Sequence, residues 1–292
     1  VREVGIAIKE EVTVKSVEPF DDHVLIKTDQ GDFHAKVVVG ADGSNSIVRR
    51  AVEKHPRQHV GRALEVITPI HNILSSRSKR SDLQPNDAIA ATPSASRNDI
   101  HNQAFFDFCA VPQGISGYVW DFPTQINGEP MRCWGIYDSN TIPRPNRAPL
   151  RQVLADEMAD HGYDLDDYEL KGHPIRWYEP ANAPSVSCVI LVGDALGVDA
   201  LLGEGISPAL GYGAVAAKAI KHAFEKNDFS FRGYKRRLLR SRLGRALWRR
   251  TLIAKLFYRF KTAGWQRFIW QRMRWLVSIL AILFVTGWEK KR

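Results

Sequence analysis

The sequence contains few cysteines and no apolar run long enough to cross a bilayer. Its 292 residues include three cysteines, Cys109, Cys133 and Cys188, which lie far apart in the chain. An odd number of widely spaced cysteines predicts neither a disulfide framework nor a zinc site, and it favours a reducing, cytoplasmic compartment. The first residues carry charges instead of the apolar run of a signal peptide, so the sequence as written predicts no such signal.

Several familiar catalytic and nucleotide-binding patterns are also missing. The chain has no His-Glu-x-x-His sequence and no evident partners for a nucleophile, so a hydrolase has little support. Its nine histidines follow no metal-binding spacing, and we predict no metal site. No strand is followed by a Gly-x-Gly-x-x-Gly loop, which is the pattern that holds the diphosphate of a dinucleotide.

Acidic side chains are scarce in one part of the chain. From Arg232 to Arg292 there are 18 lysines and arginines and one acid, Glu289, which give a local charge of +17. Residues 1–231 carry a net charge of −8, although the whole chain carries +9. An acidic body therefore precedes a basic tail, and the bulk charge of the body argues against nucleic-acid binding.

Hydrophobic periodicity predicts an α/β protein with an α+β insertion. Apolar and alternating runs predict strands at 11–17, 23–28, 33–39, 103–111, 117–122, 131–137 and 186–192. Helical spacing predicts helices at 46–53, 149–161 and 207–225, the first capped by Ser44 or Asn45. The valines at 37–39 favour a buried parallel strand, and the polar composition of 75–102 indicates a long loop.

The segment that follows the last predicted strand carries the clearest chemistry. It reads Gly193-Asp194-Ala195-Leu196-Gly197-Val198-Asp199-Ala200-Leu201-Leu202-Gly203-Glu204-Gly205-Ile206. An aspartate at the carboxyl end of a buried parallel strand can accept hydrogen bonds from the sugar or polyol hydroxyls of a cofactor. Gly203 and Gly205 let the backbone approach a flat ligand, and the next helix directs free N–H groups at negative charge.

This segment resembles the second Gly-Asp motif of the superfamily of flavoprotein hydroxylases and geranylgeranyl reductases. The sequence Gly40-Ala41-Asp42-Gly43-Ser44, about 150 residues earlier, resembles the Asp-Gly motif of the same superfamily. The resemblance covers roughly residues 1–231 and implies FAD as cofactor and NAD(P)H as reductant. Leu196 and Ala200 depart from the usual Ala and Pro, and the loop before Gly203 is one residue shorter than the superfamily pattern.

Carried over by position, the resemblance implies a set of cofactor-binding residues. Asp194 would bind the ribityl or ribose hydroxyls of FAD, and the backbone around Gly205 would direct N–H groups at the flavin ring. The complete expected set is Asp42, Gly43, Gly193, Asp194, Gly197, Gly203, Glu204, Gly205 and Ile206. No catalytic side chain is assigned, because in this superfamily the flavin carries the chemistry.

An aromatic strand between the two motifs resembles the Tyr-x-Trp-x-Phe-Pro signature of the geranylgeranyl reductase branch. Alternation places Tyr118, Trp120 and Phe122 on one face of a strand. This face is either a wall for a long apolar substrate or an ordinary aromatic core. The later Gly-x-Gly of that branch is half present, as Gly135, which leaves the substrate open.

The expected architecture is an incomplete FAD-binding parallel-sheet domain with an inserted, mostly antiparallel substrate domain. We assign residues 1–60 and 181–231 to the FAD-binding domain, 61–180 to the substrate domain and 232–292 to a helical tail. Because the chain has neither an initiating Met nor a Gly-x-Gly-x-x-Gly unit, we expect a fragment that lacks the first part of its FAD site. A natural minimal variant is the alternative.

The basic tail predicts a segment at a membrane surface. The 14 uncharged residues from Trp275 to Trp288 would span about 21 Å as a helix, less than the bilayer core of about 30 Å. Upstream, an apolar stripe interrupted by arginines occurs at helical spacing: Leu239, Leu243, Leu247, Ile253, Phe257 and Phe260. We favour docking at anionic headgroups over a solvated or partner-packed helix, and either over nucleic acid.

Three functions remain open from the sequence. The favoured one is an FAD-dependent oxidoreductase, peripheral at the membrane, that reduces carbon–carbon double bonds of a prenyl or isoprenoid lipid. A flavin-dependent monooxygenase is the alternative within the same superfamily, because both use one scaffold. The third is a truncated, non-catalytic protein whose tail binds a membrane or a partner.

Overall fold

The computed structural model describes residues 5–53, 60–70, 103–108 and 110–273, together with Trp275, Leu276 and Ile279. The chain divides into two compact units. Unit 1 contains residues 1–58, 178–198 and 205–245, and unit 2 contains residues 59–177, 199–204 and 246–292. The predicted loop at 75–102 and nearly all of the uncharged segment at 275–288 lie outside the described residues.

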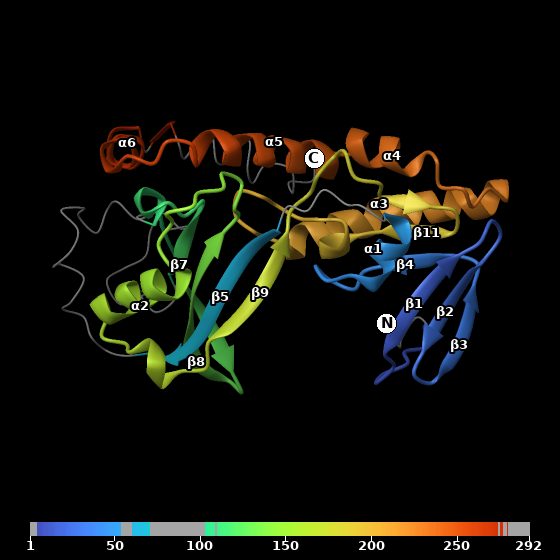
Figure 1. The fold of residues 1–292 in the computed structure, drawn as a ribbon, viewed down its shortest axis with the longest axis horizontal. Coiled ribbons are helices and arrows are strands. Elements are labelled where there is room, and N and C mark those ends of the chain that lie inside the picture. Colours follow the sequence, from blue (N-terminus) through green and yellow to red (C-terminus); the bar gives the residue numbers. More distant parts are fainter. Residues whose placement is uncertain are drawn as a thin grey trace. The chain divides into compact units, whose positions relative to one another are not determined.

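Unit 1 contains two three-stranded sheets (Figure 1). The first is an antiparallel meander of β1 (Val14–Pro19), β2 (Val24–Thr28) and β3 (Gly31–Ala35). In the second, β4 (Val38–Gly40) pairs in parallel with β11 (Val189–Leu191), whose other neighbour is the antiparallel β10 (Ser185–Val186). The strand predicted at 33–39 is therefore two strands, because the chain bends at Lys36 and passes from one sheet to the other.

The two strands of the parallel pair differ in burial. Val189, Ile190 and Leu191 of β11 are fully buried, as predicted, whereas Val39 of β4 is 42% exposed. β11 has a neighbouring strand on both sides in the described sheet, whereas β4 lies at its edge. The parallel pairing of β4 was predicted correctly, and the burial of its valine run was not.

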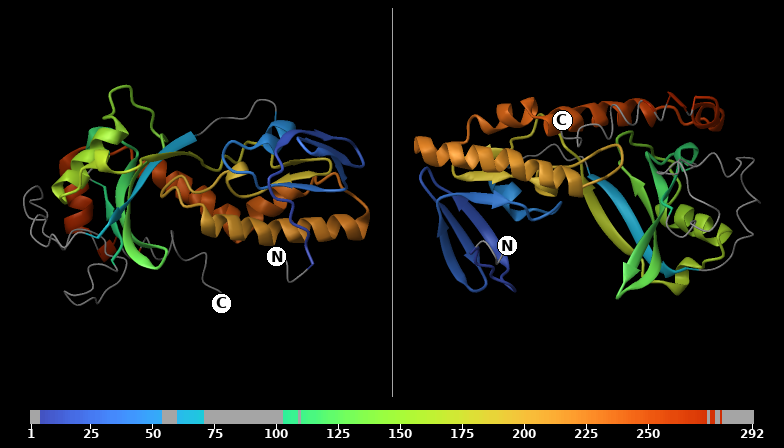
Figure 2. Two further views of the ribbon diagram at one scale, coloured as in Figure 1. Left: turned by 90° about the horizontal axis from the view of Figure 1, so that it is seen from below. Right: turned by 180° about the vertical axis from the view of Figure 1, so that it is seen from behind.

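The helices of unit 1 begin close to their predicted positions. α1 (Ile47–Val52) is capped by Ser46, whose Oγ accepts from the Arg49 N–H at 2.8 Å, instead of by Ser44 or Asn45. α3 (Ile206–Lys226) is the long helix coloured gold to orange in Figure 2, and α4 (Tyr234–Arg240) follows it. Buried alanines along α3, among them Ala216 and Ala219, let the helix pack closely.

Unit 2 is built on a five-stranded antiparallel sheet with the order β6-β7-β8-β5-β9. Its strands are β5 (Val60–Pro69), β6 (Phe105–Asp107), β7 (Gly117–Ile126), β8 (Glu129–Asp138) and β9 (Lys171–Arg176). α2 (Leu150–Asp160) buries Val153, Leu154 and Met158 in a cluster with residues of the sheet. The predicted mixture of a parallel pair and a larger antiparallel sheet is confirmed.

Short 3-10 turns complete the described connections: η3 (Val111–Gln113), η4 (Leu165–Asp167) and η5 (Gly193–Ala195). Cys133 and Cys188 are free thiols, and Cys109 lies outside the described residues.

The basic tail is helical, as predicted. It forms α5 (Arg242–Phe257), α6 (Ala263–Arg267) and a π-helical turn at Phe268–Arg272. Leu243 and Leu247 of the stripe assigned to a membrane are buried within the protein, so that interpretation of these two leucines is wrong. Within the part of the chain that the structure describes, every helix is too short or too polar to cross a membrane.

Candidate functional site

The two predicted motifs lie side by side in unit 1. Gly40, at the end of β4, and Leu191, at the end of β11, are register partners in the parallel ladder. Asp42 and Asp194 therefore follow neighbouring parallel strands at the same edge of the sheet, where ligands bind in open α/β sheets. A Cβ on Gly40 would lie 2.8 Å from the Cβ of Val48 in α1 and 2.7 Å from the Leu191 side chain, so the approach of α1 to the end of β4 requires glycine.

A buried arginine connects the two motifs. The Nη1 of Arg49 donates to the Ser44 carbonyl at 2.9 Å and to the Ala195 carbonyl at 3.3 Å. These carbonyls belong to the loops that follow the two parallel strands. Arg49 thus holds the two motif loops together. The sequence did not indicate this contact, because Arg49 and Ala195 are 146 residues apart.

Asp42 serves chiefly to order its own loop. Its Oδ1 accepts from the Ser46 Oγ at 2.5 Å, and its Oδ2 accepts from the backbone N–H groups of Ile47 and Val48 at 2.7 and 3.2 Å. An acidic side chain at the first N–H groups of a helix is a stabilising arrangement. Gly43 follows in the left-handed region with φ of +76°, which glycine adopts without strain. A direct contact of Asp42 or Gly43 with a cofactor stays a prediction.

Asp194 is the one residue between Leu191 and Leu201 that is not fully buried. It lies in η5, between Gly193 (φ of +55°) and the turn at Gly197 (φ of +124°). Partial burial raises the pKa of the Asp194 carboxyl, and its own backbone N–H opposes that shift. The carboxyl group is thus partly desolvated and partly accessible, which suits an acceptor for ligand hydroxyls.

The start of α3 lies beside Asp194. A Cβ on Gly205 would lie 3.1 Å from the Asp194 Oδ1, so the absence of a side chain there leaves room for the carboxylate. Gly205 is also the N-cap residue of α3, and glycine offers no side-chain acceptor for the first N–H groups of the helix. Ile206 is the first residue of α3, and its side chain is exposed. The start of α3 is therefore suited to binding a negatively charged or hydrogen-bonding ligand.

The second half of the motif, Asp199–Glu204, belongs to unit 2 and is tightly fixed there. The Asp199 carboxylate accepts from the backbone N–H groups of Leu201 and Leu202 at 2.8 and 3.3 Å. The Gly203 N–H donates to the Asp199 carbonyl at 3.1 Å, so this N–H is engaged within the loop. Gly203 has φ of +68°, and a Cβ there would lie 2.9 Å from the ring of Tyr137.

Three buried tyrosines hold three consecutive carbonyls of this loop. The hydroxyl of Tyr137 donates to the Ala200 carbonyl at 3.3 Å. The hydroxyls of Tyr258 and Tyr118 donate to the Leu201 and Leu202 carbonyls, each at 2.7 Å. Burial, reinforced by the Asp199 carboxylate, raises the pKa of all three phenols. They therefore remain protonated donors at neutral pH.

An arginine of the basic tail completes the fixation of the loop. The Nη1 of Arg250 in α5 lies 3.1 Å from the Asp199 Oδ2 and 3.7 Å from a carboxylate oxygen of Glu204. Both partners of the Arg250–Asp199 pair are buried. Burial raises the pKa of Asp199, while Arg250 and the two backbone N–H groups oppose the shift. The loop is thus set by groups from β7, β8 and the tail.

The predicted aromatic face is present in unit 2. Tyr118 and Trp120, and Trp120 and Phe122, have ring centroids 6.0 Å apart, and Phe106 of β6 contacts both ends of the row. Trp120 lies across Gly135 of β8, where a Cβ would come within 2.1 Å of the indole ring. The common face is confirmed, and its role as a substrate wall stays a prediction.

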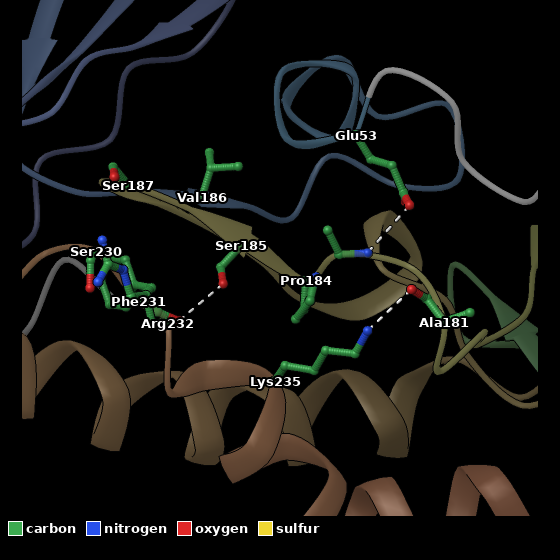
Figure 3. A pocket seen from close by; sticks show the side chains of 11 residues that line it. Glu53, Ala181, Pro184, Ser185, Val186, Ser187, Ser230, Phe231, Arg232 and Lys235 are labelled. Carbon is green, nitrogen blue, oxygen red and sulfur yellow. Dashed lines mark hydrogen bonds between the residues drawn. The ribbon is translucent and has the colours of Figure 1, made fainter.

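Figure 3 shows a pocket of about 540 Å³ in unit 1 that contains none of the predicted site residues. Its polar groups hold its own walls: Lys235 Nζ donates to the Ala181 carbonyl at 3.1 Å, and Ser185 Oγ donates to the Phe231 carbonyl at 3.2 Å. The remaining lining residues are Glu53, Ala183, Pro184, Val186, Ser187, Ser230 and Arg232. We assign no function to this pocket.

The sequence missed Asp199, Arg250, Tyr137 and Tyr258 as parts of the loop. One signal was available, because a single aspartate within the apolar run Val198–Leu202 requires a buried partner. The partner itself lies 51 residues away, and spacing could not identify it. Among the described residues no group of three His, Cys, Asp or Glu side chains is placed to hold a metal ion.

No family model matches this chain. A search of curated proteins finds an uncharacterized protein of Methanosarcina barkeri (strain Fusaro / DSM 804) that is 30% identical over 236 residues. The match covers 80% of this chain and 51% of that protein, so the chain spans about half the length of the curated relative it matches.

Solved structures of similar fold include a geranylgeranyl bacteriochlorophyll reductase-like protein from Thermoplasma acidophilum. It is 23% identical, with a TM-score of 0.57, and the match covers 85% of this chain and 57% of that one. The halogenase PltM is 14% identical, with a TM-score of 0.58 and coverage of 96% of this chain and 55% of its own. The chain therefore has the fold that these two proteins share, and it corresponds to somewhat more than half of each.

Proposed function

We propose that this chain contributes the cofactor-binding edge around Asp194 to an FAD-dependent oxidoreductase. The observation that carries the proposal is the position of Asp194, which is accessible at the carboxyl end of a parallel strand while its neighbours are buried. The resemblance of both Gly-Asp motifs to flavoprotein hydroxylases and geranylgeranyl reductases supports it. The shared fold with a geranylgeranyl bacteriochlorophyll reductase-like protein supports it further.

The residues at this edge fit the chemistry of FAD. The partly buried Asp194 carboxylate is an acceptor for polyol hydroxyls, and the glycine at 205 leaves room beside it. No side chain caps the first turn of α3, and the positive end of the helix dipole favours a polar ring edge or a developing negative charge there. FAD, when bound, would supply hydride-transfer chemistry, with NAD(P)H as the reductant in this proposal.

The chain's own residues would bind and orient rather than act as acids or bases. Asp194 would hold the cofactor through its hydroxyls, and Arg49 would keep the two motif loops together. The tyrosine hydroxyls and Arg250 would keep the Asp199–Glu204 loop in one conformation. Pre-ordering a binding loop reduces the entropy that a ligand must overcome.

We further propose a prenyl or isoprenoid lipid as the substrate. The row of Tyr118, Trp120 and Phe122 offers a continuous aromatic surface of the kind that accommodates a long apolar chain. In such a reaction a carbon–carbon double bond gains a hydride and a proton, and NAD(P)H is oxidised. A monooxygenase remains the second candidate, supported by the resemblance of the same motifs to flavoprotein hydroxylases.

Cofactor binding can be tested directly on the purified chain. We expect FAD to bind with quenching of its fluorescence, and we expect Asp194→Asn to weaken this binding. Asp32→Asn, at an exposed position in β3, is the matched control and should bind as the wild type does. Equal binding by wild type and Asp194→Asn would contradict the role given to Asp194. Absence of flavin from the full-length protein that contains this chain would contradict the proposal and favour a non-catalytic protein.

The reaction is then tested with NADPH and a geranylgeranyl lipid under strictly anaerobic conditions. Reduction predicts oxidation of NADPH and a lipid product that has gained two hydrogens for each reduced double bond. A monooxygenase would form product only with oxygen and would add an oxygen atom to the substrate. Phe122→Ala should raise the KM for long-chain substrates more than for short ones if the aromatic row binds the lipid.

A further inference from the structure

The helix α5 has a buried face, which packs within unit 2, and an exposed face. Leu247, Arg250, Ala254 and Tyr258 are buried in unit 2. Ala254 and Tyr258 pack in one apolar cluster with Trp177 and the loop residues Ala200 and Leu201. This face anchors the helix, so the direction of its opposite face is fixed with respect to unit 2.

The opposite face carries three large apolar side chains in a row. Trp248, Leu252 and Leu256 are 54%, 55% and 62% exposed. Residues four positions apart in a helix lie one above the other, so these three form a continuous apolar stripe along two turns. The stripe is distinct from the buried leucines Leu243 and Leu247. Phe260 continues the exposed apolar surface beyond the end of the helix.

The charged side chains in the same stretch of the chain are all cationic. Lys255, Arg259 and Lys261 are exposed within and just beyond the same stretch. The sequence contains no acid between Arg232 and Glu289 that could neutralise them. Long cationic side chains can lie along apolar surface with the charge in water, and tryptophan prefers the boundary between an apolar and a polar medium.

We infer that the exposed face of α5, formed by Trp248, Leu252 and Leu256 with the surrounding cations, docks on an anionic lipid bilayer. The positive charge is complementary to anionic headgroups. The phosphates of a nucleic acid would match the charge too, but they offer no apolar surface to the leucines. A helix that presents apolar side chains on one side and is anchored to protein on the other lies in the plane of the interface. This inference does not depend on the bound cofactor.

Vesicle flotation of the full chain tests the proposal. We expect binding to vesicles of phosphatidylglycerol and phosphatidylcholine in equal parts, and much weaker binding to pure phosphatidylcholine. The double variant Leu252→Ser/Leu256→Ser should bind at least about tenfold more weakly, because each leucine contributes apolar transfer free energy. Leu210→Ser, at a similarly exposed leucine of α3, is the matched control and should bind as the wild type does.

Thermal unfolding curves show whether each variant is folded, and lipid binding is scored on folded protein. Wild-type binding by the double variant, or absence of binding by the wild type, would overturn the inference. A dimer in solution that Leu256→Ser converts to a monomer would instead assign the stripe to a second copy. Competition by duplex RNA that is insensitive to the leucine substitutions would assign the cations to nucleic acid. Because none of these measurements uses FAD, their outcome is independent of the proposed enzymatic function.

Discussion

Two aspartates five residues apart in one motif have opposite surroundings. Asp194 is partly exposed, and the contribution that opposes its pKa shift comes from its own backbone N–H. Asp199 is fully buried and is held by Arg250 and by the N–H groups of Leu201 and Leu202. One carboxylate is available to a ligand, whereas the other is used to shape the loop.

The comparison shows that residue type and motif position do not decide which acid binds a ligand. Both aspartates follow glycines or small apolar residues in the same short segment. The difference arises from a residue far away in the sequence. Arg250 in the tail pairs with the carboxylate of Asp199 and not with that of Asp194. The same substitution, Asp to Asn, therefore has different expected effects at the two positions.

The largest effect is expected for Asp199→Asn. It removes the nearer and fully buried of the two carboxylates beside the Arg250 guanidinium and leaves Glu204 at 3.7 Å. Breaking a buried ion pair costs about 3–5 kcal/mol of unfolding free energy. Asp194→Asn removes a partly buried charge that has no opposite partner among the described residues and should leave the unfolding free energy equal or slightly higher. Urea unfolding of the two variants measures this difference. Equal destabilisation by both substitutions would remove the distinction between the two acids.

The second effect concerns FAD affinity. Asp194→Asn should weaken FAD binding about tenfold to hundredfold, because a hydrogen bond to a charged acceptor contributes about 1.5–3 kcal/mol. Fluorescence titration of FAD measures the dissociation constant. Asp156→Asn, at an acid of helix α2 in unit 2, should leave it unchanged and serves as the control.

A smaller effect is expected for Tyr258→Phe. It removes the donor to the buried Leu201 carbonyl and should cost about 1–2 kcal/mol of stability. It should also increase hydrogen exchange at the amides of the Asp199–Glu204 loop more than at those of β11. Unchanged exchange in that loop would show that the tyrosine does not hold it.

The smallest expected effect is a pH dependence of stability and FAD affinity that arises from Asp194. The pKa of Asp194 is raised in the folded chain. Above this pKa the ionised carboxylate destabilises the folded state, and this destabilisation disappears as the pH falls below the folded-state pKa. FAD affinity should fall over the same interval, beginning above the ordinary aspartate value of about 3.9, because the acceptor becomes protonated. Titrations of wild type and Asp194→Asn at several pH values test this, and a parallel decline in both would contradict it.

Local pattern was enough to predict the strands that carry the two motifs. The apolar runs before Asp42 and Asp194 predicted buried strands of a parallel sheet, and the structure shows that β4 and β11 pair with each other in parallel. The alternation of Tyr118, Trp120 and Phe122 predicted their common face for the same reason. In both cases the governing geometry repeats within a few residues and is visible in the sequence.

The orientation of the tail could not be predicted in this way. Its apolar residues predicted a helix, but leucines at 243 and 247 face the protein while those at 252 and 256 face outward. Apolar residues occur on more than one side of the helix. Without the knowledge that Arg250 pairs with Asp199, the sequence did not show which side is buried. The face is decided by the buried pair that Arg250 forms with Asp199.

The sequence alone determined the pair of Gly-Asp motifs, the strands that carry them and the contrast between an acidic body and a basic tail, but it missed β5 and β9. Tertiary structure decided which aspartate is accessible, which hydroxyls hold the Asp199–Glu204 loop, and which face of α5 is exposed. The physical reason is that burial and charge compensation depend on groups far apart in the chain. Arg250 and Asp199, 51 residues apart, lie 3.1 Å from one another only after folding.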